Sequence, residues 1–430
     1  MGWVTRAVFP DPRLRLRAAP AHRGAAPAHR GAAPADREAA AADRTAAPVG
    51  GGPPVVRYAV IPSLDRARFL LPLVSRRVTA ASVLAYNALR PPKVRASRAV
   101  IGALAGLGLL DLLRAPVLSV SAPGGVPERE MLLADHLSAV LGHDRLHAAI
   151  GIRPPDPHHK PTLQLFDDAG TPRGYAKIGW NDATRRMVRS EAATLRRLPH
   201  GGDYPDGLPL ICVTRWHDRE VAVIEPMPRS VRRIRRPDRP RPAALLAVAR
   251  RGGPPAPPRP VRGSPFLAGL RARAAGTHPA IRAAIDALAV RDGGLLLEFG
   301  DWHGDWVPWN LARHGRRLLA WDWENSAPGV PIGFDLAHQA FQTALSTRRL
   351  PAAAACAAMD AVLHRHGGDL RLDVAQRRFV GDGYLVELWL RTHELAAGGG
   401  GWNPRLHPAL LHLLAERLDL AEPGPPPISG

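Results

Sequence analysis

Hydrophobic positions along this chain of 430 residues follow a strand-like spacing in one stretch and a helix-like spacing in the next. Short apolar runs bounded by turn residues predict a helix at 182–198 and strands at 146–152, 162–166, 173–180, 210–216 and 220–225. Beyond residue 262 the apolar spacing predicts helices at 264–275, 278–290, 334–346, 351–366, 374–395 and 407–419. Within that part, only 295–323 returns to short, strand-like runs. The pattern predicts an α+β fold, with a small antiparallel β-sheet followed by a mainly helical part.

The chain before residue 146 divides into two segments. Residues 1–53 hold few large apolar side chains, and the unit Ala-Pro-Ala-His-Arg-Gly-Ala occurs twice in tandem within 10–53. Such a segment cannot offset the entropy lost on ordering, so we expect a disordered low-complexity tail. Residues 54–145 are expected to form an α/β extension, either with its own small fold or as a cap on the rest of the chain. Its predicted elements are strands at 56–62 and 117–120 and helices at 76–89, 96–114 and 128–141.

The longest apolar run lies within this extension, at 99–110. It is too short to span a bilayer, because a crossing helix needs about 20 residues. The simplest interpretation is a buried helix. A helix lying on a membrane surface is the alternative, since Arg95 and Arg98 flank the run.

One loop in the strand-rich segment carries the residues most suited to chemistry, namely His303, Gly304, Asp305 and Asn310. Phosphoryl transfer needs a carboxylate that accepts the proton of the attacking hydroxyl and an amide oxygen that holds Mg²⁺. An H-x-D-x-x-x-x-N loop supplies both. An apolar strand then ends at Asp322, where a second carboxylate would hold the Mg²⁺ that bridges the phosphates.

Three motifs occur in order: His303-Gly304-Asp305 with Asn310, then Asp322-Trp323-Glu324, then Asp335-Leu336-Ala337. This set resembles the aminoglycoside phosphotransferase and choline kinase superfamily, which has a protein-kinase-like fold. The resemblance implies that Asp305 is the catalytic base, with His303 in the same catalytic group. It implies that Asn310 and Asp322 are Mg²⁺ ligands and that Asp335 is a structural carboxylate.

The resemblance also implies a two-lobed, protein-kinase-like α+β fold with an N-terminal extension. The N-lobe would be the small antiparallel sheet at 146–228, and the mainly helical C-lobe would be 263–422, followed by a tail at 423–430. Residues 229–262, rich in Arg and Pro, would be an insert or linker between the lobes.

A kinase-like site also needs a strand lysine on the phosphates, oriented by a helix glutamate. Lys177 lies in a predicted strand and Glu191 in the following helix, and Lys177 is one of only three lysines in the chain. The alternative for Lys177 is an exposed strand lysine that binds nothing. By resemblance, Glu225 and Met227 belong to the hinge that meets the adenine ring, whereas the plain interpretation is a strand end.

The turn between the first two N-lobe strands departs from the kinase pattern, since it has no G-x-G-x-x-G. It contains three prolines, which lack the backbone N–H groups that cradle phosphate. Arg153, His158 and Lys160 either supply cationic contacts instead or lie in a solvated turn.

Tryptophans cluster around the catalytic loop. Trp302, Trp306 and Trp309 are candidates for a platform that stacks on a sugar or a cationic acceptor, with packing as the alternative. For Trp321 and Trp323 we favour packing beneath the site. Glu324 is expected either to support the site or to contact the acceptor.

The formal net charge of +20 suggests an anionic partner. Almost all of this charge is Arg, in a chain whose heavy use of Ala, Gly, Pro and Arg is typical of GC-rich coding. Its basic runs lie in tails and inserts without interleaved aromatic residues, which disfavours nucleic acid. The basic stretch at 229–262 instead suggests an anionic acceptor. Two widely spaced cysteines fit a reducing, cytoplasmic location, with weak association at an anionic membrane surface as an addition.

The sequence therefore predicts a phosphotransferase that uses ATP, or alternatively GTP, with Mg²⁺ to phosphorylate a hydroxyl of a small molecule such as a saccharide, amino sugar or amino alcohol. The alternatives are a pseudokinase or nucleotide-binding regulatory module, and a basic adaptor. The enzyme is favoured because Lys177, Glu191, Asp305, Asn310 and Asp322 are all present. The sequence predicts no particular oligomeric state.

Overall fold

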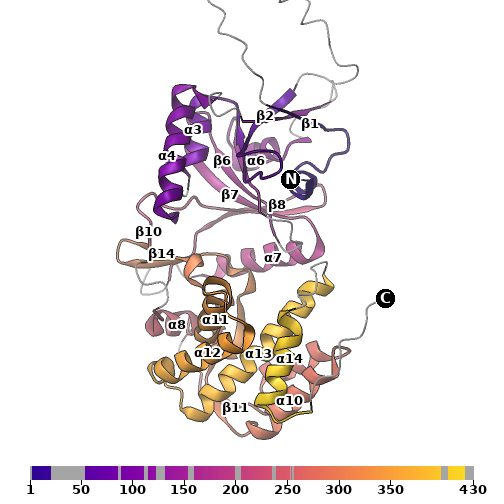
Figure 1. The fold of residues 1–430 in the computed structure, drawn as a ribbon, viewed down its shortest axis with the longest axis vertical. Coiled ribbons are helices and arrows are strands. Elements are labelled where there is room, and N and C mark those ends of the chain that lie inside the picture. Colours follow the sequence, from indigo (N-terminus) through magenta and orange to yellow (C-terminus); the bar gives the residue numbers. More distant parts are fainter. Residues whose placement is uncertain are drawn as a thin grey trace, which may run out of the picture. The chain divides into compact units, whose positions relative to one another are not determined.

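The computed structural model describes residues 2–20, 54–85, 89–110, 115–122, 131–153, 159–198, 205–234, 239–251, 253, 256–398 and 405–421. The chain forms two compact units (Figure 1). The first comprises Met1–Pro155, Lys160–Ile178 and Thr214–Pro226, and the second comprises Asp156–His159, Gly179–Val213 and Met227–Gly430. The first is rich in strands and the second is mainly helical, so the predicted α+β class is confirmed.

The first unit contains a nine-stranded sheet in the order β1-β4-β2-β3-β5-β6-β7-β9-β8. The boundary between the units falls within β8, between Val213 and Thr214. From β1 to β7 in this order, each strand pairs antiparallel with its neighbour. The strands are β1 (Arg15–Ala19), β2 (Pro54–Ile61), β3 (Phe69–Pro72), β4 (Val117–Ser121), β5 (His147–Gly151), β6 (Thr162–Phe166), β7 (Pro172–Gly179), β8 (Leu210–Trp216) and β9 (Arg219–Ile224). The helices are α1 (Gly2–Val8), α3 (Arg76–Leu84), α4 (Pro92–Leu107) and α6 (Leu133–Leu141).

Two expectations for the N-terminal part need correction. The segment 1–53 is not disordered throughout, because α1 buries Trp3 and Val4 and β1 pairs with β4, while 21–53 lie outside the described residues. The extension at 54–145 has no sheet of its own, because β3 pairs with β5 and joins it to the N-lobe strands. The first residues are ordered because β1 pairs with β4 at the edge of the sheet, where the backbone groups of β4 are open to hydrogen bonding.

The helix predicted from the apolar run at 99–110 is present as α4, but it is not buried. Val100 and Leu107 are 60% and 66% exposed, while Gly102 and Ala105 face inward. Small residues face inward because α4 packs closely on α3, where a Cβ at position 102 would press on Leu84. Among the described residues, no helix combines the length and the hydrophobicity needed to cross a membrane.

The second unit is built from helices around three small antiparallel sheets. Its helices are α7 (Asp182–Arg197), α8 (Pro242–Ala249), α9 (Pro265–Ala274), α10 (Pro279–Arg291), α11 (Phe334–Gln342), α12 (Ala352–His366), α13 (Val374–Ala397) and α14 (Leu406–Arg417). Its strands are β10 (Arg232–Arg233), β11 (Arg259–Pro260), β12 (Leu296–Leu297), β13 (Phe299–Trp302), β14 (Leu311–His314), β15 (Arg317–Ala320) and β16 (Ala327–Pro331). β14 pairs with both β10 and β15, and β13 pairs with β16.

Local sequence explains where the longest helices begin. Asn181 and Asp373 each accept a hydrogen bond from the backbone three residues on, and each forms a reciprocal capping box, so α7 and α13 start there. Phe334 on α11 packs edge-to-face against Trp302 and Tyr384, which places α11 between β13 and α13. This packing fixes the two helices that contact the loop at 303–310.

Candidate active site

The loop between β13 and β14 carries the residues expected to catalyse. β13 ends one residue before His303, and a 3-10 turn at Pro308–Asn310 leads into β14. Gly304 has a φ of 79°, and a Cβ there would collide with the backbone carbonyl oxygen of Asn325. Both the positive φ and this contact exclude a side chain, so backbone geometry requires the glycine before Asp305.

Asp335, in the first turn of α11, binds the backbone of this loop through its carboxylate. Its Oδ2 accepts a hydrogen bond from the backbone N–H of His303 at 2.7 Å, and its Oδ1 accepts one from that of Gly304 at 3.0 Å. Burial raises the pKa of this carboxyl to about 6, although the two backbone N–H groups act in the opposite direction. These contacts support the structural role expected of Asp335.

Asp305 is held through both of its carboxylate oxygens. Oδ1 lies 3.0 Å from Nε2 of His338, and Oδ2 accepts a hydrogen bond from Nδ2 of Asn310 at 2.8 Å. Burial alone would raise the pKa of Asp305, but the hydrogen bond from His338 and then the charge of Arg391 bring it below its ordinary value. The side chain is still 31% exposed. Asp305 is therefore an ionised, oriented and accessible carboxylate.

Two further residues, His338 and Arg391, contact the loop, and the sequence pattern did not predict them. His338 lies one helical turn after Asp335 on α11, and Arg391 on α13 donates a hydrogen bond to the backbone oxygen of Gly304 at 2.6 Å. The spacing of Asp335 and His338 could have indicated His338, because residues three apart share a helix face. Nothing in the local sequence indicated Arg391, which lies 87 residues from the glycine that it contacts.

His303, expected in the catalytic group, is completely buried. Its Nδ1 accepts a hydrogen bond from the backbone N–H of Asp305 at 3.2 Å, and its ring lies 4.3 Å from the ring of Trp323. Burial lowers the pKa of His303 to about 4, so the ring is neutral near pH 7. His303 therefore stabilises the conformation of the loop through its hydrogen bond to Asp305 and its packing on Trp323.

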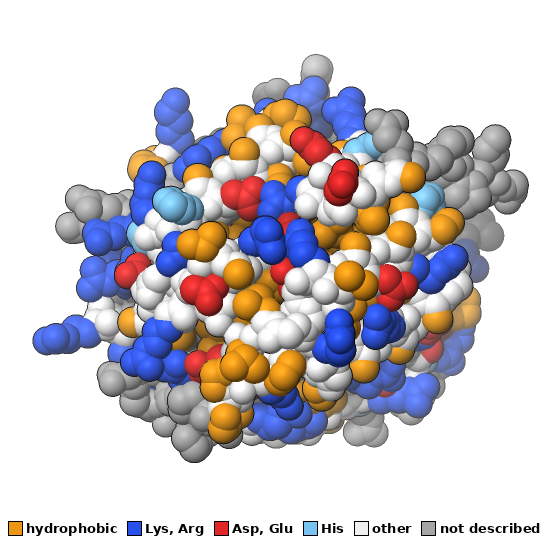
Figure 2. All heavy atoms as spheres, turned by 90° about the horizontal axis from the view of Figure 1, so that it is seen from below, with side chains coloured by type: hydrophobic (Ala, Val, Ile, Leu, Met, Phe, Trp, Pro, Cys, Tyr) orange, Lys and Arg blue, Asp and Glu red, His pale blue; other side chains and the backbone are white. Residues whose placement is uncertain are grey.

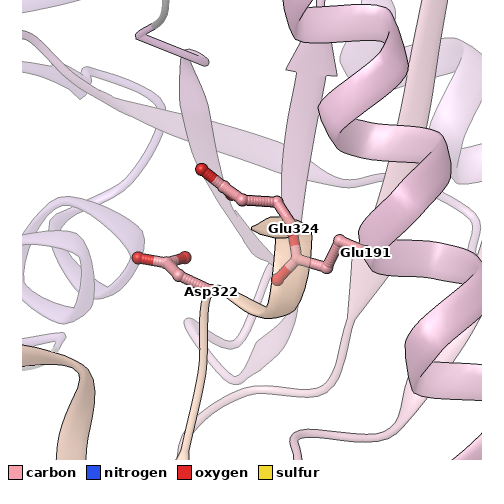
Figure 3. Close-up of side chains that lie close together, drawn as sticks. All are labelled: Glu191, Asp322 and Glu324. Atoms are coloured by element: carbon pink, nitrogen blue, oxygen red, sulfur yellow. The ribbon is translucent and has the colours of Figure 1, made fainter. Parts of the chain in front are cut away.

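Three carboxylates meet beside the loop. Asp322 follows β15 in a left-handed conformation (φ 64°, ψ 54°), Glu324 lies in the next 3-10 turn, and Glu191 projects from α7 (Figure 3). One oxygen from each lies within 4.8 Å of the others. Asn310 is adjacent by register, because the backbone N–H of Trp321 donates to its carbonyl oxygen at 3.2 Å. Carboxylate and amide oxygens are the ligands that Mg²⁺ prefers, so this donor set fits that ion.

Arg251 connects β13 to the turn that follows Asp322. Its guanidinium donates to Asp301 at 2.7 Å and to the hydroxyl of Ser326 at 2.9 Å. That hydroxyl donates to the backbone oxygen of Trp302 at 2.7 Å, and the Arg251 guanidinium lies over the ring of Trp323. β13 and the turn after Asp322 are therefore tied together.

The tryptophans separate into two groups. Trp302, Trp306 and Trp323 are 3%, 0% and 1% exposed, whereas Trp309 is 47% exposed. Trp306 is thus buried against His303 and presents no face to a ligand, which corrects its interpretation as part of a platform. Trp309 alone of the three platform candidates keeps an exposed ring, and Trp323 packs beneath the site as expected.

The residues expected to bind nucleotide are divided between the two units. Lys177 is buried in β7 of the first unit, and Glu191 is buried in α7 of the second. The boundary between the units falls between Pro226 and Met227, with Glu225 exposed just before it. His158 lies outside the described residues.

Comparison with known proteins gives likenesses in structure alone. Neither a protein-family model nor a curated protein matches the chain. The choline kinase LicA from Streptococcus pneumoniae is 12% identical, with a TM-score of 0.44 over 68% of this chain and 99% of that one. A thermostable mutant of the aminoglycoside phosphotransferase APH(4)-Ia is also 12% identical, with a TM-score of 0.42 over 67% of this chain and 97% of that one. The amicoumacin kinase hAmiN is 14% identical, with a TM-score of 0.38 over 63% and 86%.

Proposed function

We propose that the protein is a phosphotransferase that transfers the γ-phosphoryl group of ATP to a hydroxyl of a small molecule, such as a saccharide, amino sugar or amino alcohol. The observation that carries this proposal is the state of Asp305, which is ionised, held at both oxygens and 31% exposed. A carboxylate of this kind beside an oxygen-rich cation site is the arrangement that phosphoryl transfer requires.

Asp305 acts as the base in this proposal. Each of its oxygens accepts one hydrogen bond within the protein and retains a second lone pair for the acceptor hydroxyl. The hydroxyl proton passes to Asp305 as the hydroxyl oxygen bonds to the γ-phosphorus and the bond to the ADP oxygen breaks. His303 and Asp335 keep the loop in place while this occurs.

Asp322, Asn310 and Glu324 would hold Mg²⁺. When bound, that ion would neutralise negative charge on the phosphates. Lys177 is proposed to contact the α- and β-phosphates, with Glu191 as its orienting partner, and Glu225 and Met227 to flank the adenine ring. GTP is the alternative donor for the same contacts.

Trp309 is the exposed ring beside the loop and is proposed as the acceptor contact. A cytoplasmic location is proposed because Cys212 and Cys356 are both free thiols. Association with an anionic membrane surface is a weaker addition, motivated by the exposed apolar residues of α4 near Lys93 and Arg95.

The test measures nucleotide binding and transfer separately. Calorimetry with ATP and GTP, each with and without Mg²⁺, should show Mg²⁺-dependent binding in the wild type. Asp305→Asn should bind the nucleotide equally well and lose transfer to any acceptor found in a panel of amino sugars, saccharides and amino alcohols. Full turnover by Asp305→Asn would contradict the assignment of the base. Absence of nucleotide binding under every condition would favour the regulatory or pseudokinase alternative.

A further inference from the structure

The imidazole of His338 is placed so that only one of its nitrogens can carry a proton. Its Nδ1 lies 3.1 Å from the hydroxyl of Tyr384 and 3.5 Å from Nη2 of Arg391. A guanidinium only donates hydrogen bonds, so Nδ1 must be the acceptor. Burial lowers the pKa of His338, which keeps the ring neutral. The proton therefore lies on Nε2, the atom that faces Oδ1 of Asp305 at 3.0 Å.

The hydrogen bond that His338 donates to Asp305 matters because the carboxylate of an aspartate rotates easily about its last bond. Asn310 holds one oxygen from within the loop, and His338 holds the other from α11. Two donors from different elements fix both the plane of the carboxylate and the lone pairs that remain for a hydroxyl. Tyr384 is completely buried on α13, so its ring and hydroxyl are held by the surrounding side chains.

We propose that His338, backed by Tyr384, is a positioning residue that fixes the orientation of the Asp305 carboxylate for transfer. The inference rests on the proposed function of Asp305 as base. His338 gives up no proton in the reaction. Its Nε2–H stays directed at Asp305 while the hydroxyl proton reaches one of the remaining carboxylate lone pairs.

His338→Leu removes the donor, whereas His338→Gln places an amide N–H near the position of Nε2. We expect His338→Leu to lower kcat roughly ten- to hundredfold with an unchanged KM for MgATP, because a misplaced base slows only the chemical step. His338→Gln should recover most of that loss, and Tyr384→Phe should show a smaller loss. His364, exposed on α12, gives the matched control His364→Gln, which should behave as wild type. If the Leu and Gln variants lose activity equally, or if KM alone changes, the positioning role is wrong.

A second measurement does not depend on turnover. Heteronuclear NMR of histidine-labelled wild-type protein reports which ring nitrogen of His338 is protonated, and the signal is assigned by its loss in His338→Gln. A proton on Nε2 supports the proposal, and a proton on Nδ1 overturns it. If the wild type neither binds MgATP nor transfers phosphate, the proposed function fails, while this measurement still decides the direction of the hydrogen bond.

A separate feature of the second unit is an open cavity of about 750 Å³ between the start of α8 and the turn of the β14–β15 hairpin. Its lining contains four arginines, namely Arg239, Arg241, Arg313 and Arg316. None of the four forms an ion pair within the described parts of the chain. Arg271, Arg273, Arg291 and Arg417 by contrast all pair with acidic residues. On the face shown in Figure 2, acidic side chains also lie among the basic ones.

The positive charges of these arginines repel one another. Burial, and then the charges of Arg313 and Arg239, lower the pKa of Arg241. Arg232 on β10 also lies directly opposite Arg313 on β14, a cross-strand pairing that is destabilising for like charges. A bound anion would remove this repulsion.

The geometry points to a second binding site in this cavity, for a small, multiply charged anion with phosphate groups. It is distinct from the proposed acceptor position, because Asn310 and Asp322 lie at the open end of the hairpin and Arg316 at its turn. Along a four-residue strand these ends are about 10 Å apart. The basic stretch at 229–262, which suggested an anionic acceptor, contributes Arg239 and Arg241 to this cavity. None of the described residues that line the cavity is aromatic, which disfavours a nucleic-acid strand.

The probe is inorganic tripolyphosphate, titrated calorimetrically into the full chain with EDTA present to suppress binding through Mg²⁺. The wild type should bind it, and Arg241→Gln with Arg313→Gln together should weaken binding about tenfold or more. The control pair Arg282→Gln and Arg365→Gln, on α10 and α12, changes the net charge equally and should have no such effect. Absence of binding by the wild type, or equal loss in both double variants, would overturn the proposal. So would an affinity for oligonucleotides that grows with their length.

Discussion

Replacement of Asp335 tests how the catalytic loop is held. Asp335→Ala removes the acceptors for the backbone N–H groups of His303 and Gly304, which lie 2.7 and 3.0 Å from the carboxylate. A hydrogen bond to a charged group contributes about 1.5–3 kcal/mol, so loss of both should lower the free energy of unfolding by about 3–6 kcal/mol. Asp335→Asn keeps one acceptor and should lose about half as much.

The pH dependence of this effect follows from the pKa of Asp335, which burial raises to about 6 in the folded state. In the unfolded chain it is near 3.9. Between these values the folded protein binds more protons, so this group's stabilisation is fully present below about pH 4 and is lost as the pH rises through 6. A difference of about two units corresponds to roughly 3 kcal/mol. The destabilisation caused by Asp335→Asn should therefore be larger at acidic than at neutral pH.

Urea unfolding followed by tryptophan fluorescence measures this difference, because Trp302, Trp306 and Trp323 are buried around the loop. The other carboxyl groups titrate in both proteins and cancel when wild type and Asp335→Asn are compared at each pH. A difference that stays constant or shrinks on acidification would show that the two backbone N–H groups outweigh burial and that Asp335 remains ionised. A loss below about 1 kcal/mol for Asp335→Ala would refute its role in holding the loop.

Other substitutions test the remaining parts of the site. Gly304→Ala should abolish transfer and lower the free energy of unfolding by about 1–3 kcal/mol, measured by urea unfolding, because an alanine is strained at this φ. Asp322→Ala should remove the Mg²⁺ dependence of nucleotide binding in calorimetry, whereas retained dependence would point to other ligands. Trp309→Ala should change the melting temperature little, since the ring is 47% exposed, but should raise the acceptor KM if Trp309 stacks on it.

Much of the secondary structure could be predicted because its signals are local. The strand predicted at 210–216 coincides with β8, and the helix predicted at 182–198 differs from α7 by one residue. Alternating or helical apolar spacing marks such elements, and cap residues such as Asn181 mark where they begin. The proposed catalytic loop could be predicted for the same reason, since Asp305 and Asn310 lie within one short segment.

The rest could not be predicted because it depends on contacts between distant residues. β1 is ordered by pairing with β4, about a hundred residues away in the chain, and its own composition gives no sign of this. Burial of Trp306 against His303 likewise depends on the packed fold, because an aromatic residue near a catalytic loop is equally suited to stacking or to packing. The contacts of His338 and Arg391 with the loop belong to the same class.

The position of α13 links these distant contacts to the carboxylate of Asp305. Tyr384 and Arg391 lie two turns apart on this helix and contact His338 and the loop, so a shift of α13 along its axis would break both contacts. Asp382, on the same helix, is buried and paired at 2.5 Å with both Arg291 of α10 and Arg417 of α14. A buried carboxylate is costly unless its partners stay in place, so this cluster resists sliding of α13 against its neighbours. These ion pairs hold the helix that carries Tyr384 and Arg391, although they do not contact the loop themselves.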